Sequence, residues 1–345
     1  MTTIQRIGFC CKWLNDPSEC GGMKVNAVDR DLNGRSTTMR WLREHPGDAD
    51  QRQWDIMNHN AAAAVRLIER VATLPPERRM VRLGSEMLQG YTEPNWISWW
   101  QRPEIQDHLA RIFAPIGETA RRLDVRLSFH PGQFCVLASE ADEIVERSIL
   151  EFEYHADMAR WMGYGSTWHD SGFKINIHLS GKGGPAKFIQ TLGRLTPEAR
   201  NLITVENDEI SNGVDVTLQV ADHVALVLDI HHHWIRTGEY MDPADHRVQQ
   251  VIDSWRGIRP AMHYSVSRED LLVDHDPDVK PNLDRLLAQG FKKQKLRAHS
   301  DFLWNQASNA WAITFSPNFD IQVEAKGKNL ASDQLYQQSI TNDQS

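Results

Sequence analysis

The chain has 345 residues, of which 41% are hydrophobic and 24% charged, a composition typical of a globular protein with a large core. Its net charge of −8 argues against a surface that coats nucleic acid non-specifically, although a local basic groove remains compatible with it. The chain has no run of 18 apolar residues that would predict a membrane span, and its N-terminus lacks the apolar region of a signal peptide. The four cysteines form no CxxC pair, so we expect a cytoplasmic protein.

Short apolar runs alternate with helical patterns along the chain. We predict eight strands, at residues 4–11, 79–84, 125–130, 173–179, 201–207, 223–230, 258–265 and 321–325. Apolar residues recur with helical spacing at Val65, Ile68 and Val71 within 54–74, which predicts a helix there. A second helix is expected over 139–163, capped by Ser139, with one face formed by Ile144, Ser148, Phe152, His155, Met158 and Ala159.

The repeated strand–helix alternation predicts parallel strands joined by right-handed crossovers. Eight such units indicate an α/β fold, a (β/α)₈ TIM barrel in a single domain over residues 1–328, followed by a loose polar tail over 329–345. An open doubly wound sheet is the alternative, but it needs a glycine-rich first turn, and residues 9–16 do not supply one.

Metal-ligand residue types end six consecutive predicted strands. These residues are His130, His178, Glu206, Asp229, His263 and Glu324. One histidine at a strand end is more often a structural residue, but six successive ends meet at one face of a barrel, where active sites lie. Carboxylates crowded there repel one another unless cations neutralise them, and imidazole with carboxylate suits Zn²⁺, Mn²⁺ or Fe²⁺. We therefore predict two or three ions and a hydrolytic reaction at a phosphate.

Several further segments near these strand ends also require an interpretation. One residue of the triplet at 231–233 is expected to join Asp229. Residues 181–188, which include Lys182, either hold a phosphate at a helix N-terminus or form a flexible loop. The basic run at 291–299 either contacts phosphates or is a solvated charged face. The tryptophans of 95–100 either pack in the core, which we expect, or stack on bases. Cys10, Cys11 and Cys135 are either buried thiols, which we expect, or ligands.

The strand-end motifs together resemble those of the ultraviolet damage endonucleases, which are TIM barrels related in architecture to endonuclease IV. The resemblance rests on "FHPGQF", "IHLSG", "VENDE", "LDIHHH", "MHYS" and "VEAKGK", in this order, and it extends from about residue 4 to about residue 328. It implies a DNA repair endonuclease that incises DNA immediately 5′ to ultraviolet photolesions, and it leaves other distorting lesions and abasic sites open as substrates. The implied cofactors are divalent ions, commonly Mn²⁺, with Zn²⁺, Fe²⁺ or Mg²⁺ as alternatives. The expected partner is damaged double-stranded DNA, and the expected state is a monomer.

The same resemblance assigns roles to individual residues. It implies eight metal ligands, His130, His178, Glu206, Asp229, His232, His263, His299 and Glu324, of which His130, Glu206 and Glu324 are also expected to be catalytic. Gln133 and Phe134 correspond to the pair that probes the lesion. The remaining residues expected to contact DNA are Phe9, Lys182, Lys292, Lys293, Lys295, Arg297 and Lys326.

The sequence departs from the family at three positions. Phe9 and Phe134 stand where tyrosine is usual, and Ala261 stands where a lysine is frequent.

Two other functions are compatible with parts of the pattern. A sugar isomerase-like barrel shares the metal face but needs neither a probing Gln133–Phe134 pair nor a basic run. A non-catalytic DNA-binding module would not need the full ligand set, and the acidic net charge argues against it.

Overall fold

A computed structural model describes residues 5–16 and 29–342. Its strands form one closed parallel barrel in which each strand pairs with the next along the chain and β8 pairs with β1. The strands are β1 Ile7–Cys10, β2 Met80–Arg82, β3 Arg126–Phe129, β4 Lys174–His178, β5 Ile203–Glu206, β6 Ala225–Asp229, β7 Ala261–Tyr264 and β8 Asp320–Val323. The predicted (β/α)₈ barrel is confirmed, and each observed strand lies within or at the edge of a predicted apolar run.

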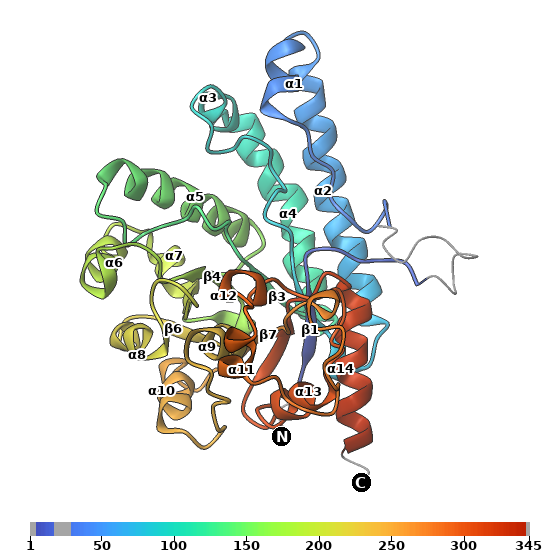
Figure 1. Cartoon of the computed structure of the whole chain (residues 1–345). Coiled ribbons are helices and arrows are strands. Elements are labelled where there is room, and N and C mark those ends of the chain that lie inside the picture. Colours follow the sequence, from blue (N-terminus) through green and yellow to red (C-terminus); the bar gives the residue numbers. More distant parts are fainter. Residues whose placement is uncertain (1–4, 17–28, 343–345) are drawn as a thin grey trace.

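Helices surround the barrel, and the lobe that carries α1 and α3 extends well beyond it (Figure 1). The helices are α1 Met39–Glu44, α2 Ala49–Ala72, α3 Ile97–Trp100, α4 Pro103–Arg122, α5 Asp142–Trp161, α6 Gly184–Leu192, α7 Pro197–Leu202, α8 Val214–Thr217, α9 Ile230–Thr237, α10 His246–Ser254, α11 Leu283–Ala288, α12 Lys293–Leu296, α13 Gln306–Ile313 and α14 Lys328–Asn342. Among the described residues, no helix has both the length and the apolar character needed to cross a membrane.

The strand register brings the candidate ligands to one level of the barrel. His178 at the end of β4 pairs with Glu206 at the end of β5, and Asp229 at the end of β6 pairs with His263 on β7. Because all eight strands are parallel, these carboxyl ends meet at the same mouth.

The interior of the barrel is unusually polar below this mouth. Arg126 on β3 and Asp320 on β8 form a buried ion pair at 2.8 Å, and Arg259 donates to the other oxygen of Asp320 at 2.7 Å. Lys174 and Asn176 on β4 are also buried. Apolar side chains fill the layer between the strands and the helices, and they include Trp99 and Trp100, as predicted for the 95–100 segment.

Two local predictions were wrong. The segment predicted as a loose tail, 329–345, forms helix α14 as far as Asn342, and buried Ala331 and Leu335 of this helix join the main core. Residues 343–345 of the predicted tail lie outside the described residues. Only a few apolar residues face the barrel in this helix, so its overall polarity concealed it. In α5, Val145 is buried whereas Ile144 is 37% exposed, and the helix begins after Ala141 instead of Ser139, which accepts a hydrogen bond from the Ala141 amide in a turn.

Candidate metal centre and the surface around it

Two groups of candidate ligands lie at the mouth of the barrel and share one carboxylate. His130, His178 and Glu206 form the first group, and Glu206, Asp229 and His263 form the second. Within each group, one ligand atom from every residue lies within 4.8 Å of the others. Glu206 is therefore the residue that belongs to both groups.

Several of these ligand atoms are buried and have no hydrogen-bond partner among the residues that the structure describes. They are Glu206 Oε1, Asp229 Oδ2, His178 Nδ1 and His263 Nδ1. A buried polar atom without a partner is costly, and a cluster of four such atoms from imidazoles and carboxylates is the donor set that divalent transition ions prefer. The residues present therefore fit a metal centre.

Burial and neighbouring charges shift the pKa values of several candidate ligands at this mouth. Burial raises the pKa of Asp229 well above its usual value, and the negative charges of Glu206 and Glu324 add to this effect while His232 opposes it. Burial lowers the pKa of His130 and brings the pKa of His263 to about 4. These two imidazoles are consequently neutral at pH 7, the form that binds metal, and a cation would relieve the repulsion among the carboxylates.

The remaining candidate ligands surround the two groups. His232 Nδ1 lies 3.2 Å from Glu206 Oε1 and 3.6 Å from Asp229 Oδ2. His299 and Glu324 line a 410 Å³ pocket together with His130 and His178. Glu324 also forms a partly buried ion pair with Arg82 at the end of β2.

The histidine triplet contains one candidate ligand. His232 is the member that approaches Asp229, which also accepts a hydrogen bond from the His232 amide at 2.7 Å. His231 is hydrogen-bonded to Ser265 at 2.9 Å, and His233 pairs with Glu239 at 2.8 Å, away from the centre.

Two buried residues of β4 that the sequence analysis did not single out lie directly below the ligands. Lys174 places its Nζ 3.2 Å from His263 Nε2, and burial lowers the pKa of this lysine to about 7. Asn176 donates a hydrogen bond to Glu206 Oε2 at 2.5 Å. The signal that could have found them is the alternation of Lys174, Asn176 and His178, which places three polar side chains on the inner face of one strand.

The residues expected to probe DNA lie at the rim of the centre. Gln133 lines the 410 Å³ pocket, and the neighbouring Phe134 is 84% exposed. Phe9 is instead 1% exposed and packs edge-to-face on Trp13, because its position on β1 turns it toward the helices. This placement does not support the expected contact between Phe9 and DNA.

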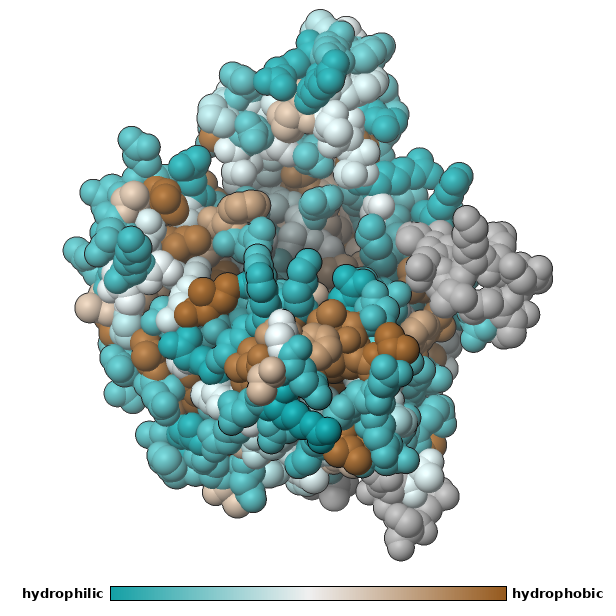
Figure 2. Space-filling view, viewed as in Figure 1, coloured by the Kyte–Doolittle hydropathy of each residue, from teal (hydrophilic) through white to brown (hydrophobic). Residues whose placement is uncertain are grey.

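The basic residues have different surroundings. Lys295 and Arg297 line a 750 Å³ pocket with His232 and His299, and Arg297 is paired with Glu209 at 2.8 Å. Lys293 donates to the Arg236 carbonyl at 2.7 Å, and Lys326 pairs with Asp301 at 3.0 Å. Lys182 and Lys292 are exposed. Figure 2 shows a mostly hydrophilic face with separate hydrophobic patches.

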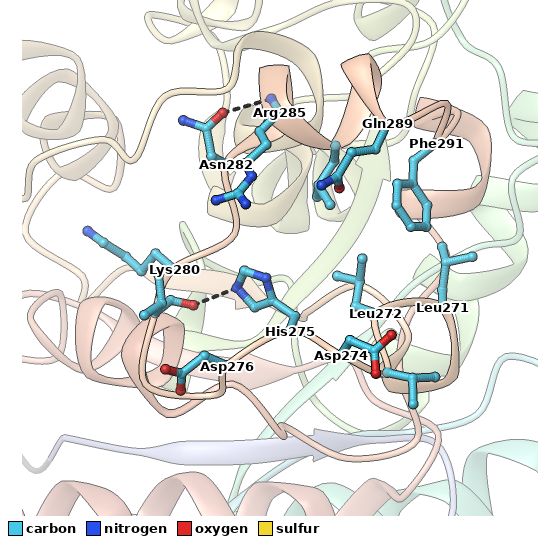
Figure 3. Close-up of a pocket in the computed structure, with 13 residues that line it drawn as sticks. Leu271, Leu272, Asp274, His275, Asp276, Lys280, Asn282, Arg285, Gln289 and Phe291 are labelled. Atoms are coloured by element: carbon cyan, nitrogen blue, oxygen red, sulfur yellow. Dashed lines mark hydrogen bonds between the residues drawn. The ribbon is translucent and has the colours of Figure 1, made fainter.

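A third pocket has a volume of 640 Å³ and is lined by none of the predicted ligands. Figure 3 shows the residues that line it. Residues 271–291 supply its lining, with Leu271, Leu272 and Phe291 close together in the view and His275 bonded to the Val279 carbonyl at 2.8 Å. None of the eight candidate metal ligands lines this pocket, so its volume does not identify it as the reaction site.

Comparisons with known proteins identify the family and the fold. The model of a family described as UV-endonuclease UvdE matches residues 20–343. A UV-damage endonuclease of Neurospora crassa is 28% identical over 63% of this chain, which spans only 36% of that relative's length. A UV DNA damage endonuclease of Bacillus mycoides is 24% identical over 87% of this chain and 86% of its own. The crystal structure of SacUVDE shares the fold, with a TM-score of 0.68 over 98% of both chains at 22% identity.

Proposed function

Because this chain belongs to the UV-endonuclease UvdE family, we propose that it is a DNA repair endonuclease that incises the phosphodiester bond immediately 5′ to an ultraviolet photolesion, with two or three divalent ions, Mn²⁺ foremost, as its cofactors. The observation that carries the proposal is the position of Glu206, which belongs to two ligand groups at the mouth of the barrel. One chain supplies all eight candidate ligands, so we expect a monomer to be active.

The bound ions would supply charge neutralisation at the attacked phosphate and a water that is acidic enough to react at neutral pH. The residues of the chain would hold and orient them. His130 and His178 would act on one side of Glu206, and Asp229 and His263 on the other. Arg82 would keep the Glu324 carboxylate in place through their partly buried ion pair.

The rim supports a DNA substrate over a small molecule. Phe134 is 84% exposed beside the pocket that contains the candidate ligands. An exposed aromatic ring can stack on a base or fill the space that a displaced photolesion leaves, and damaged bases are easier to displace than intact ones. A sugar isomerase-like barrel would have no use for this ring, and Lys295 beside the same mouth suits a phosphate backbone.

The test compares nicking of irradiated and unirradiated supercoiled plasmid by protein that has been stripped of metal and reloaded with Mn²⁺. We expect nicking of the irradiated plasmid only, and we expect Glu206→Gln to lose most of its bound metal and nearly all nicking. Glu118→Gln, an exposed glutamate on α4, is the matched control and should behave as wild type. Full metal content and full nicking in Glu206→Gln would refute the proposal.

A further inference from the structure

A buried amide lies between two strands beneath the candidate bridging carboxylate. Asn176 on β4 pairs in register with Thr204 on β5, two residues before Glu206 on the same strand. All three side chains are 0% exposed. Asn176 Nδ2 donates to Glu206 Oε2 at 2.5 Å, and Thr204 Oγ1 donates to Asn176 Oδ1 at 2.8 Å.

Glu206 and Thr204 together determine which way the amide points. The carboxylate only accepts hydrogen bonds, so the amide nitrogen faces Glu206, and the Thr204 hydroxyl donates its proton to Asn176 Oδ1. With the amide reversed, its oxygen would face the carboxylate without a proton between them, and the Thr204 hydroxyl would have to accept from the amide nitrogen instead of donating. Thr204, Asn176 and Glu206 therefore form a chain of hydrogen bonds with one direction.

We propose that Asn176, oriented by Thr204, is a positioning residue of the metal centre that sets the rotation of the Glu206 carboxylate. It donates to Oε2, whereas Oε1 has no hydrogen-bond partner among the described residues. With the carboxylate plane fixed in this way, its two oxygens face different ligand nitrogens. Oε2 lies 2.9 Å from His263 Nδ1 and 3.6 Å from His130 Nε2, and Oε1 lies 3.2 Å from His232 Nδ1. The inference rests on the proposed function only through the assignment of Glu206 as a ligand shared by two ions.

A purely structural role would not require this arrangement. A buried asparagine that served packing alone could satisfy its amide on backbone groups, as Asn60 does with Arg35 and Met87. Asn176 instead donates its amide hydrogen bond to the carboxylate that two ligand groups share. Partners that orient metal ligands in this manner typically affect metal affinity by about 10- to 100-fold when they are removed.

The experiment measures Mn²⁺ affinity of the full chain by competition with a chelator, together with the visible absorption spectrum of the Co²⁺-loaded protein. We expect Asn176→Leu to weaken Mn²⁺ binding by about 10- to 100-fold. Thr204→Val should weaken it less and shift the Co²⁺ bands, because the amide stays but can rotate. Thr204→Ser keeps the hydroxyl and should keep the Mn²⁺ affinity and the Co²⁺ spectrum of wild type. Asn60→Leu should lower stability without changing the Mn²⁺ affinity or the Co²⁺ spectrum.

Wild-type Mn²⁺ affinity and Co²⁺ spectrum in folded Asn176→Leu would overturn the inference. If that variant does not fold, the same result in Thr204→Val would overturn it. Nicking of irradiated plasmid is measured on the same samples. A wild-type protein that binds metal but does not nick would refute the proposed function, and a nicking protein whose metal binding is insensitive to Asn176 and Thr204 would refute this inference alone.

Discussion

Replacing Lys295 with glutamine is expected to weaken DNA binding and to reduce its dependence on salt. Lys295 lies in the pocket that also contains His232 and His299, so its charge faces the mouth of the barrel. Lys293, two residues earlier, donates instead to the Arg236 carbonyl and does not line that pocket. The structure thus separates two lysines that the sequence places in one basic run.

The expected size follows from counterion release. Each phosphate contact contributes about 0.9 to the slope of log affinity against log salt concentration, so Lys295→Gln should lower that slope by about 0.9. Between about 50 and 200 mM salt, the affinity ratio of wild type to variant should therefore shrink by about 3.5-fold. Arg297 is unsuitable for this test, because its removal would unpair Glu209, whose carboxylate lies 3.8 Å from His232 Nε2.

The assay is fluorescence anisotropy of a duplex with one thymine dimer, recorded over a series of KCl concentrations in the nicking-deficient Glu206→Gln background. Lys293→Gln is the matched control, since an amide at that position can still donate to the Arg236 carbonyl. An unchanged slope in Lys295→Gln, or an equal reduction in Lys293→Gln, would show that the mouth-facing position of Lys295 has no special role.

Three further changes have defined outcomes. Phe134→Ala should reduce the ratio of nicking on irradiated to unirradiated DNA with metal content unchanged, since one lost stacking contact costs about 1–3 kcal/mol. Gln133→Ala should reduce this ratio more mildly. An unchanged ratio would contradict the probing role. Burial lowers the pKa of His169 to about 3, so the folded state resists protonation of this ring. The metal-free protein should therefore lose stability as the pH falls below about 6.5, by up to about 1.4 kcal/mol per pH unit from this ring. In urea unfolding at pH 5 and pH 7, His169→Gln should lose less stability than wild type between the two pH values. Leu335→Ala should cost about 2–5 kcal/mol in the same unfolding assay, because α14 is part of the core; a loss below about 0.5 kcal/mol would mean that the tail is dispensable.

The sequence predicted the residues at the strand ends well for a topological reason. A parallel barrel brings the carboxyl ends of all its strands to one mouth, so His130, Glu206 and His263 could be placed together without knowing any side-chain position. Their pairing into two groups around Glu206 could not be predicted in this way, because it depends on strand register and on side-chain rotamers.

The layer beneath the mouth was less accessible to sequence reasoning. Residues 173–179 were interpreted as an apolar strand, although Lys174 and Asn176 alternate with the apolar residues and point inward. Fully buried polar side chains are rare, and only the surrounding partners, such as His263 for Lys174, show that the interior accepts them. The same limit applies to α14, in which buried Leu335 lies within a mostly polar sequence.

The most direct test of the shared carboxylate is the dependence of nicking on the number of ions per chain. Metal-free protein, at a concentration well above the dissociation constant for Mn²⁺, is titrated with Mn²⁺ and assayed on an end-labelled duplex that contains one thymine dimer. We expect little cleavage up to the first equivalent, a steep rise as the second binds, and one product cut immediately 5′ to the dimer. Full cleavage with a single equivalent, or without metal, would contradict this expectation.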